Sequence, residues 1–294
     1  MSKQSAVALG TFDGLHIGHT AVITSALRQK ESGLVPVTLL FDEHPQAVLG
    51  KAPLEILQKS KRAELLSLWG MKTETVRFAD ICQMTPEAFF TDILLNQLHA
   101  GALCCGENYR FGAGGAGDIA LLRDLCDANG ITLCVSPCVA YEGEPVSSTR
   151  IRRAVENGDI KAANAMLGRP FCYRYPVVHG DARGRLIGAP TANQHFDSGF
   201  AVPAFGVYAA AVTVNGCRYP GVTNIGVRPT FDGRELRSET HIIGFCGDIY
   251  GQTIEIGLLN RIRGEIRFDS MEALAAQIAA DKERSVAEYR EKED

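Results

Sequence analysis

One stretch decides the fold of the N-terminal half: Gly10-Thr11-Phe12-Asp13-Gly14-Leu15-His16-Ile17-Gly18-His19. It follows the apolar run 6–9 and leads into a segment with helical periodicity, 20–30. The order strand, glycine turn, helix start is typical of an α/β sheet, where backbone N–H groups and a helix dipole meet phosphates. The two imidazoles would donate hydrogen bonds to oxygens that gain charge during phosphoryl or nucleotidyl transfer. The stretch therefore predicts nucleotide chemistry.

Two other interpretations of His16 and His19 stay open at this point. Their spacing can place both imidazoles on one metal ion, although no Cys or acidic residue nearby completes a familiar zinc pattern. The two side chains could also be surface groups of an ordinary turn. That interpretation explains neither the three glycines nor the second histidine at a helix start.

Composition limits the classes of protein to consider. The chain has 294 residues, which suggests two domains, each long enough to bury a core. Its hydrophobic share of 46% and its charged share of 22% are ordinary for a globular protein. Lys and Arg number 30 against 34 Asp and Glu, a net charge of −4, so no nucleic-acid-binding face is expected.

The N-terminus and the cysteines indicate a cytoplasmic protein. Residues 1–5 lead directly into the first expected strand, which leaves no room for a signal peptide. No apolar run approaches the ~20 residues of a membrane-spanning helix, so no membrane association is expected. The nine cysteines are an odd number and many lie in apolar runs, so we expect reduced core thiols. The oligomeric state is not predicted.

Short apolar strands alternate with helical segments as far as residue 168. The expected strands are 6–9, 34–41, 74–78, 102–105 and 131–136, and the expected helices are 20–30, 60–69, 86–99 and 119–129. This alternation predicts a doubly wound, Rossmann-like parallel sheet, in which ligands bind at the carboxyl ends of the strands. His16 and His19 follow the first strand, and His44 and Asn108 follow the second and fourth. We therefore expect these side chains to meet at one edge of the sheet.

Strands without long intervening helices follow the Leu167-Gly168-Arg169-Pro170 segment. The strands expected in this half are 172–179, 206–214, 218–222, 237–245 and 253–259. They predict an antiparallel β-barrel or sandwich, and 270–290 predicts one terminal helix. We place the boundary near residue 168, which gives the domains 1–168 and 169–294.

Two further segments are suited to holding a nucleotide. The glycine-rich segment 106–118 lacks the Lys-Ser/Thr ending of a P-loop, so we interpret it as a mobile loop over a ligand. Ser148 and Thr149 open a predicted helix, with Arg150 directly after them. Hydroxyls at a helix start usually cap it, but together with arginine they can clamp a triphosphate.

Together these segments resemble the bacterial bifunctional riboflavin kinase/FMN adenylyltransferase family, also called FAD synthetases. In the first half, 10–19 matches G-x-F-D-G-x-H-x-G-H, 41–45 matches F-x-x-H-P, 106–112 matches the glycine-aromatic loop and 147–152 matches S-S-T-R-I-R. In the second half, 180–193 resembles the kinase loop that ends in P-T-A-N, and 221–230 resembles G-V-x-N-I-G-x-R-P-T. The segments occur in the family's order and the resemblance covers nearly the whole chain.

The resemblance implies two activities. The C-terminal domain would phosphorylate riboflavin to FMN with ATP, and the N-terminal domain would transfer AMP from ATP to FMN, giving FAD and pyrophosphate. It implies Mg²⁺ as cofactor, with Thr191 and Asn193 binding Mg²⁺ and the ATP phosphates. The catalytic residues would be His16, His19 and Glu239, with Glu239 as the base that faces the ribityl 5′-hydroxyl. The other nucleotide-binding residues would be Gly10, Phe12, Asp13, Gly18, His44, Asn108, Ser148, Thr149, Arg150, Gly180, Gly184 and Gly188.

Two rival functions remain open. The chain could have kept one of the two activities, or it could bind flavin without catalysis. A Thr hydroxyl and an Asn carbonyl suit Mg²⁺, and a carboxylate suits general-base work, but a turn-forming Asn and a surface Glu are equally common. Ala189 stands where the family often has Phe, and Asn108 where it often has Asp. Neither departure removes a catalytic group.

Overall fold

The computed structural model describes residues 4–48, 50, 52–180, 191–230 and 233–293. The chain divides into two units, of which the first is Met1–Glu55 with Lys59–Ser148 and the second is Ile56–Gln58 with Thr149–Asp294. Helix α8 (Ile160–Leu167) belongs to the second unit because Asn164 donates to the Leu258 carbonyl (2.8 Å) and accepts from the Phe171 N–H (2.7 Å). The boundary near residue 168 stays a prediction about where the two activities divide.

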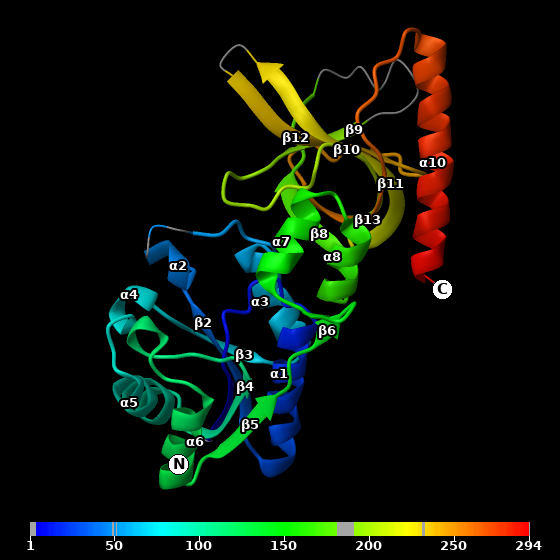
Figure 1. Cartoon of the computed structure of the whole chain (residues 1–294). Helices are drawn as coiled ribbons and strands as arrows, with labels where there is room; N and C mark the ends of the chain where they lie inside the picture. Colours follow the sequence, from blue (N-terminus) through cyan, green and yellow to red (C-terminus); the bar gives the residue numbers. More distant parts are fainter. Residues whose placement is uncertain (1–3, 49, 51, 181–190, 231–232, 294) are drawn as a thin grey trace. The chain divides into compact units, whose positions relative to one another are not determined.

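A five-stranded parallel sheet forms the centre of the first unit (Figure 1). Its strands are β1 (Ser5–Ala8), β2 (Val35–Phe41), β3 (Lys72–Val76), β4 (Ala100–Gly106) and β5 (Thr132–Ser136). They lie in the order β3-β2-β1-β4-β5, and every neighbouring pair is parallel. The prediction of a parallel sheet is confirmed. The segments that follow β1 and β4 leave the same edge of the sheet, because these two strands are parallel neighbours.

The expected helices of the first unit form, with one exception. Helices α1 (Ile17–Arg28), α3 (Lys59–Leu68) and α6 (Ile119–Asn129) confirm three predictions. The segment predicted as one helix over 86–99 instead forms the short α5 (Pro86–Ala88) and the π-helical η2 (Phe89–Gln97). The smaller elements are η1 (Gln29–Ser32), α2 (Pro45–Val48), α4 (Phe78–Ile81), η3 (Ala113–Gly115), β6 (Ala140–Tyr141) and β7 (Glu144–Pro145).

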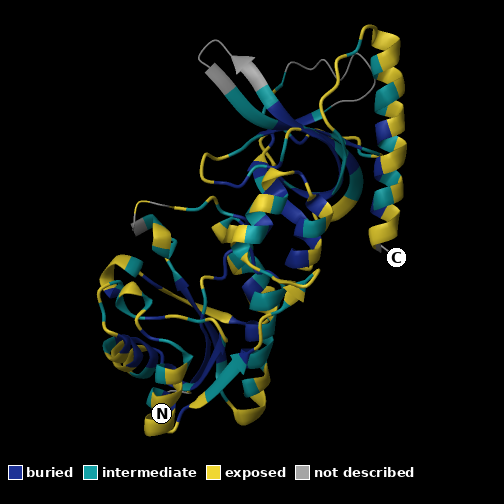
Figure 2. Ribbon diagram, in the orientation of Figure 1, coloured by how far each residue is buried: buried dark blue, intermediate teal, exposed yellow. Residues whose placement is uncertain are grey.

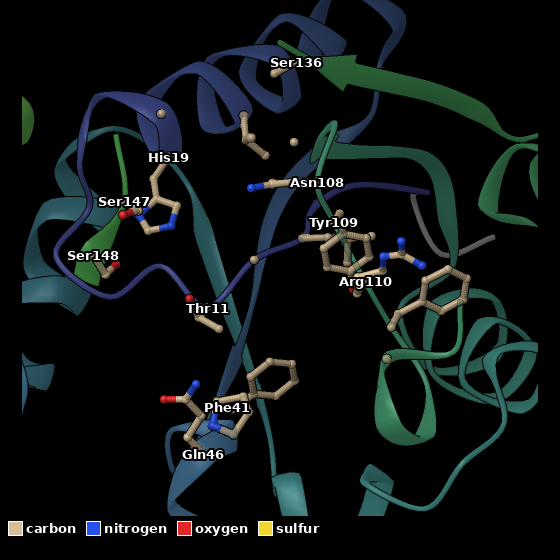
Figure 3. Close-up of a pocket in the computed structure, with 18 of the residues that line it drawn as sticks. Thr11, His19, Phe41, Gln46, Asn108, Tyr109, Arg110, Ser136, Ser147 and Ser148 are labelled. Carbon is tan, nitrogen blue, oxygen red and sulfur yellow. The ribbon is translucent and has the colours of Figure 1, made fainter. Parts of the chain in front are cut away.

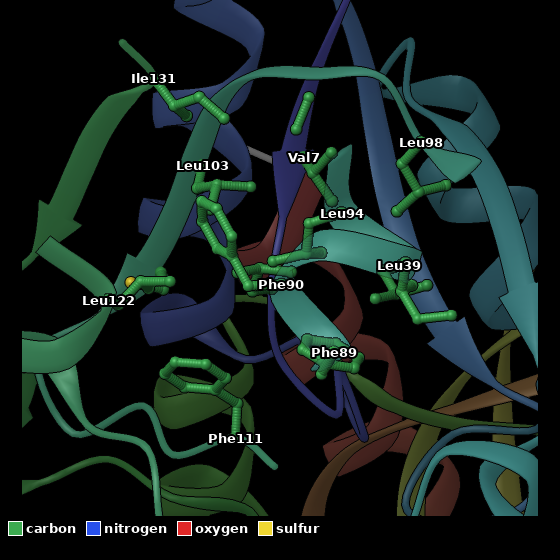
Figure 4. Packing of buried hydrophobic residues seen from close by; sticks show 14 of the residues in the cluster. Val7, Leu39, Phe89, Phe90, Leu94, Leu98, Leu103, Phe111, Leu122 and Ile131 are labelled. Atoms are coloured by element: carbon green, nitrogen blue, oxygen red, sulfur yellow. The ribbon is translucent and has the colours of Figure 1, made fainter. Parts of the chain in front are cut away.

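Aromatic and aliphatic side chains of η2 pack against the strands (Figure 4). Phe90 and Leu94 are at most 1% exposed and belong to one cluster with Val7 of β1 and Leu103 of β4. Figure 2 shows the central strands β1, β2 and β4 mostly buried, with exposed residues on the edge strand β3 and on the helices. The buried apolar side chains hold the strands in place, and the strands in turn position the loops that follow them.

A six-stranded antiparallel sheet forms the second unit and curls into a half-barrel (Figure 1). Its strands are β8 (Phe171–Pro176), β9 (Thr191–His195), β10 (Gly206–Val214), β11 (Cys217–Thr230), β12 (Gly233–Ile242) and β13 (Thr253–Arg263). The order is β8-β13-β10-β11-β12-β9, and all neighbours are antiparallel. The predicted antiparallel sheet is confirmed in this curled form, with α7 (Ser148–Glu156) and α8 preceding it in the chain.

The two edge strands of the curled sheet are joined by side-chain and backbone hydrogen bonds. Gln194 of β9 is fully buried, and its Nε2 donates to the carbonyls of Tyr175 (2.5 Å) and Ile254 (3.1 Å). The Val178 N–H, two residues beyond β8, donates to the Asn193 carbonyl (2.9 Å). These bonds satisfy backbone groups that an open sheet edge would leave exposed.

The terminal helix α10 (Met271–Glu293) covers β10, β11 and β13 and confirms the prediction for 270–290. Asp281 is 2% exposed, and its carboxylate accepts from Arg263 Nε (3.0 Å) and Nη2 (2.8 Å). Ser285, also buried, donates to the Gly221 carbonyl of β11 (2.6 Å). Polar bonds as well as apolar contacts thus hold this helix on the sheet.

Asp281→Ala is expected to destabilise the second unit by about 3–5 kcal/mol, because it leaves the largely buried Arg263 guanidinium without its carboxylate. The single tryptophan, Trp69, lies in the first unit and reports on that unit alone. Thermal unfolding should therefore show an earlier transition by circular dichroism, with Trp69 fluorescence unchanged. Glu283→Ala, on the exposed side of α10, is the control that should leave both signals in place.

The nine cysteines are all free thiols. Cys104 and Cys105 are buried in β4, and burial raises the pKa of each thiol to about 12. The expectation of core thiols is wrong for Cys138, Cys217 and Cys246, which are exposed because their segments lie in loops and at a hairpin end.

Candidate functional site

The loop between β1 and α1 has an unusual backbone conformation that is stabilised by the burial of its side chains. Phe12, Gly14 and Leu15 have φ of 51°, 80° and 45°, in the left-handed region that side chains other than glycine rarely adopt. The Phe12 and Leu15 side chains are completely buried. Their burial offsets the cost of the unusual backbone, which is of order 1–3 kcal/mol per residue, and fixes the course of the loop.

His16 and His19 form a stacked pair at the start of α1. Their ring centroids lie 3.6 Å apart with an angle of 15° between the ring planes. His16 caps the helix, because its Nδ1 accepts a hydrogen bond from the His19 backbone N–H (3.3 Å). A neutral imidazole that accepts at Nδ1 carries its proton at Nε2, so in this form His16 is a hydrogen-bond donor at Nε2. In the first helical turn the N–H groups of His19 and Thr20 donate to His16 Nδ1 and to the His16 carbonyl, and those of Ile17 and Gly18 come before them.

Gly18 leaves the space that the His16 ring occupies. A Cβ at residue 18 would lie 3.2 Å from both Cε1 and Nδ1 of His16. Such a contact is tight, so a side chain here would move the imidazole by a few tenths of an ångström. Glycine between the two histidines therefore leaves the His16 ring undisturbed in its stacked position.

Gly18→Ala is expected to lower the rate of the nucleotidyl transfer predicted for this loop by about 10- to 100-fold, because it displaces the His16 ring from its position. The same change should preserve or raise the thermal stability, since alanine favours a helix over glycine by about 1 kcal/mol. A steady-state assay of that transfer, together with a melting curve, checks the expected fall in rate and the expected stability. A parallel fall in activity and stability would show that the substitution acts by unfolding the loop.

A cavity of about 720 Å³ lies in front of this pair, within the first unit (Figure 3). The loops after β1, β4 and β5 line it, together with the segment before α7. Ser148 lies on its wall and donates to the Asp13 carbonyl (2.9 Å), which ties the start of α7 to the histidine loop. The cavity thus lies at the carboxyl ends of the strands, as predicted.

Aromatic side chains form another part of the wall. Tyr109 and Phe111 stack with centroids 5.9 Å apart and ring planes at 7°. Phe89 packs near Phe111 (6.2 Å), and Phe41 meets Phe78 edge to face (5.3 Å). Burial raises the pKa of the Tyr109 phenol, so its hydroxyl stays neutral. The same cavity therefore offers hydrogen-bond donors at α1 and flat apolar surfaces for a ring system.

The structure brings many of the predicted N-terminal residues to this cavity. Gly10, His16, Gly18, His19, Asn108 and Ser148 line it. Phe12 and Asp13 are 0% and 5% exposed and are not among the residues that line the cavity. Their side chains therefore pack inside the protein and stabilise the loop. His44 accepts from the Gln46 N–H (3.2 Å) at Nδ1, while Pro45 and Gln46 rather than His44 line the cavity. Thr149 and Arg150 follow Ser148 on α7, in the second unit.

In the second unit, β12 places Glu239 between two asparagines. Glu239 pairs with Asn193 of β9 on one side and with Asn224 of β11 on the other. Directly paired residues in adjacent strands point to the same face, so the carboxylate and the two amides share it. Arg237, two residues earlier and on that face, donates to Glu239 Oε1.

Asn193 is held by close packing and by its own strand. It is 5% exposed, its Nδ2 donates to the Thr191 carbonyl (3.3 Å), and a Cβ on Gly180 would lie 2.4 Å from that nitrogen. A larger residue at 180 would therefore displace the Asn193 amide. Thr191, Asn193 and Glu239 therefore lie on one face of neighbouring strands, and their oxygens are the kind that Mg²⁺ prefers. The predicted Gly184 and Gly188 lie outside the described residues.

Several residues at these two sites escaped prediction from the sequence. Phe41, Tyr109 and Asn224 lie inside the quoted motifs, so their position next to a predicted residue was an available signal. Phe78 and Phe89 carry no local signal, because only the packing of α4 and η2 brings them to the cavity. Among the residues described, no cluster of three or more His, Cys, Asp or Glu side chains could hold a metal by itself.

Comparison with known proteins agrees with both halves. A family model described as FAD synthetase matches residues 1–150, and one described as riboflavin kinase matches residues 167–288. Two curated proteins, from Listeria monocytogenes and Bacillus subtilis, are each named bifunctional riboflavin kinase/FMN adenylyltransferase and are each 35% identical to this chain. The matches cover 98% and 96% of this chain and 93% and 92% of those proteins.

A solved structure agrees over nearly the whole chain. It is the crystal structure of a Streptococcus pneumoniae protein described as a macrolide-efflux protein, with a TM-score of 0.89 and 34% identity over 97% of this chain and 94% of that one. In the described part of the present chain, no helix is both long and apolar enough to cross a membrane. On the identity and coverage of its curated relatives, this chain belongs to the bifunctional riboflavin kinase/FMN adenylyltransferase family.

Proposed function

We propose that this chain carries both activities of its family and makes FAD from riboflavin in two ATP-dependent steps. The observation that carries the proposal is the cavity in which a histidine pair at a helix start and an aromatic wall occur together. A nucleotide triphosphate suits the first feature and an isoalloxazine ring suits the second. Riboflavin, FMN, FAD and ATP are accordingly the ligands.

The adenylyl transfer uses the first unit. An oxygen of the FMN phosphate attacks the α-phosphorus of ATP, the bond from that phosphorus to the bridging oxygen breaks, and pyrophosphate leaves. The donor at His16 Nε2, the His19 ring and the first N–H groups of α1 would stabilise the charge that grows on these oxygens. Ser148, with Thr149 and Arg150 after it, would hold the pyrophosphate end. No protein nucleophile is required.

The kinase step uses the polar face of the second unit. Glu239 would accept the proton of the ribityl 5′-hydroxyl while that oxygen attacks the γ-phosphorus and ADP leaves. Its bond to Arg237 and its pairing with Asn193 and Asn224 fix the carboxylate on that face. Gly180, Gly184 and Gly188 are proposed as further nucleotide-binding residues of this unit.

Mg²⁺ is the cofactor we propose for the phosphate chemistry. Thr191 and Asn193 would hold it together with the ATP phosphates, because a hydroxyl and an amide oxygen suit a hard cation that keeps part of its water shell. When bound, it offsets the charge on the polyphosphate. The residues near the site fit this role through their oxygen donors.

The finer architecture forms part of the same proposal. The strand order β3-β2-β1-β4-β5 supports a doubly wound, Rossmann-like domain, with the cavity where the order reverses between β1 and β4. We assign 1–168 to the adenylyltransferase and 169–294 to a barrel-type riboflavin kinase. A cytoplasmic location suits both reactions, because ATP and riboflavin derivatives are used there.

Product analysis tests the proposal. The purified chain is incubated with riboflavin, ATP and Mg²⁺, and separately with FMN in place of riboflavin, and the flavins are separated by chromatography. FMN followed by FAD is expected in the first reaction and FAD in the second. FMN alone would remove the adenylyltransferase assignment, and no conversion would favour a flavin-binding protein.

A further inference from the structure

The adenylyltransferase cavity must bring two anions together with little positive charge in its wall. ATP and FMN both present phosphates, and their mutual repulsion opposes the attack of one on the other. Of the described residues that line the cavity, Arg110 alone has a side chain with a permanent charge. The same lining holds no Asp or Glu to neutralise it.

Arg110 has a fixed backbone and an accessible side chain. The Phe111 and Gly117 backbones exchange hydrogen bonds of 3.1 and 2.9 Å, and the Tyr109 N–H donates to the Gly106 carbonyl (3.0 Å). Gly112, with φ of 74°, packs so closely on Pro86 that a Cβ would lie 2.7 Å from its nitrogen. The segment 106–117 is thus closed on itself, while the Arg110 side chain is 62% exposed.

The ion pair of Arg110 leaves it available to a ligand. Its Nη1 lies 3.6 Å from Asp118 Oδ2, and the Asp118 side chain is 47% exposed. Exposed pairs at such a distance contribute ~0–1 kcal/mol, so an incoming phosphate can replace the carboxylate at little cost. Asp118 has a second task, because its Oδ1 caps α6 at the Leu121 N–H (3.0 Å).

The position of Arg110 favours FMN over ATP as its ligand. The hydrogen-bond donors proposed for ATP, at His16, His19 and Ser148, come from the start of α1 and of α7. Arg110 comes instead from the segment after β4 and lies in the sequence between Tyr109 and Phe111, whose rings form the aromatic wall. Figure 3 shows Arg110 beside the Tyr109 segment, across the view from His19 and Ser148. The aromatic wall is the part of the cavity suited to the flavin.

We infer that Arg110 recognises the phosphate of FMN and so makes the adenylyltransferase select a flavin phosphate over uncharged riboflavin. A guanidinium binds phosphate through two parallel N–H···O bonds, which adds orientation to charge. The role rests on the proposed function of the cavity. Arg110 would bind the FMN phosphate equally in the ground state and in the transition state. Loss of the Arg110 side chain should therefore raise KM and leave kcat nearly unchanged.

The test compares Arg110→Met, Arg110→Lys and Asp118→Asn in FAD formation from FMN. Arg110→Met is expected to raise the KM for FMN by about 10- to 100-fold, with the KM for ATP and the kcat nearly unchanged. Arg110→Lys should recover part of the loss, because it keeps a charge without the planar fork. Wild-type KM for FMN should also rise more steeply with salt than that of Arg110→Met.

Asp118→Asn is the matched control. It removes the ion pair and keeps the helix cap, since Asn caps as well as Asp, so its KM for FMN should match the wild type. A rise in Asp118→Asn equal to that in Arg110→Met would show that the ion pair matters structurally and would overturn the inference. An equal rise in the KM for ATP, or no change in Arg110→Met, would overturn it as well.

The wild type separates failure of the inference from failure of the proposed function. If the wild type forms no FAD, the adenylyltransferase assignment itself is wrong. If the wild type forms FAD and Arg110→Met does so with an unchanged KM, the assignment stands and only the role of Arg110 fails. Trp69 fluorescence during thermal unfolding, which reports on the first unit, checks that this unit is folded in each variant.

Discussion

Replacing His19 by alanine is expected to lower FAD formation from FMN by at least about 100- to 1000-fold, the usual cost of losing a preorganised donor to a developing oxyanion. The loss should also affect His16, because its ring stacks on His19 at 3.6 Å. FMN formation from riboflavin should continue, since no residue of the proposed kinase site lies in the first unit. Chromatography of the two reactions gives both rates from one preparation.

His99→Asn is the control for this substitution. His99 is exposed, lies outside the described lining of the cavity and has φ of 50°, a conformation that Asn tolerates well. Its FAD formation should equal that of the wild type. Full activity of His19→Ala would mean that the helix start and Ser148 suffice for the reaction. Loss of both products with a native circular dichroism spectrum would mean that the two sites depend on each other.

The first unit could be predicted well because its signals are local. A run of apolar residues followed by glycine and histidine predicts β1, the turn and α1, and each of these elements forms. The cavity follows, since parallel strands place the segments after β1 and β4 at one edge. The motif has a glycine between its two histidines, and the structure gives the reason: a side chain at residue 18 would press on the His16 ring.

The aromatic wall could not be predicted in full, because its members come from distant segments. Phe89 begins a π-helix whose register depends on packing with the sheet, and helical periodicity alone predicted an ordinary helix there. Phe12 was expected to bind nucleotide because it belongs to the motif. Its burial shows how one motif combines residues that face a cavity with residues that hold the loop.

The second unit was harder to predict from sequence because its strands break the usual composition rules. β9 (Thr191–His195) has polar residues on both of its faces, so it lacks the alternation of apolar and polar residues that marks a strand. One of them, Gln194, is buried because its side chain donates to the Tyr175 carbonyl of the other edge strand. β11 runs to Thr230, past the predicted end at 222, although it contains Pro220 and Gly221. A Cβ on Gly221 would lie 2.6 Å from Val212, so glycine permits close approach of the strands where the sheet curls.

Glu239→Gln is expected to lower FMN formation by about 100- to 10,000-fold, the range attributed to general-base catalysis. The amide keeps the shape and can still accept from Arg237, but it cannot take the proton of the ribityl hydroxyl. The position between Asn193 and Asn224 should persist, because the strand pairing is made by the backbone. FAD formation from added FMN should be unchanged, the reverse of the result for His19→Ala.

Glu235→Gln is the matched control, since it removes another carboxylate of β12 from the same face. Glu235 lies 2.6 Å from His195 Nδ1, and both side chains are 40% exposed, so this pair adds little to stability. Its FMN formation should therefore stay near that of the wild type. An equal loss of FMN formation in Glu235→Gln and Glu239→Gln would mean that the total negative charge on this face of β12 matters. It would argue against Glu239 as the general base. A selective loss in Glu239→Gln, with a KM for riboflavin close to the wild type, would place its effect in the chemical step, because a residue that only bound riboflavin would change KM first.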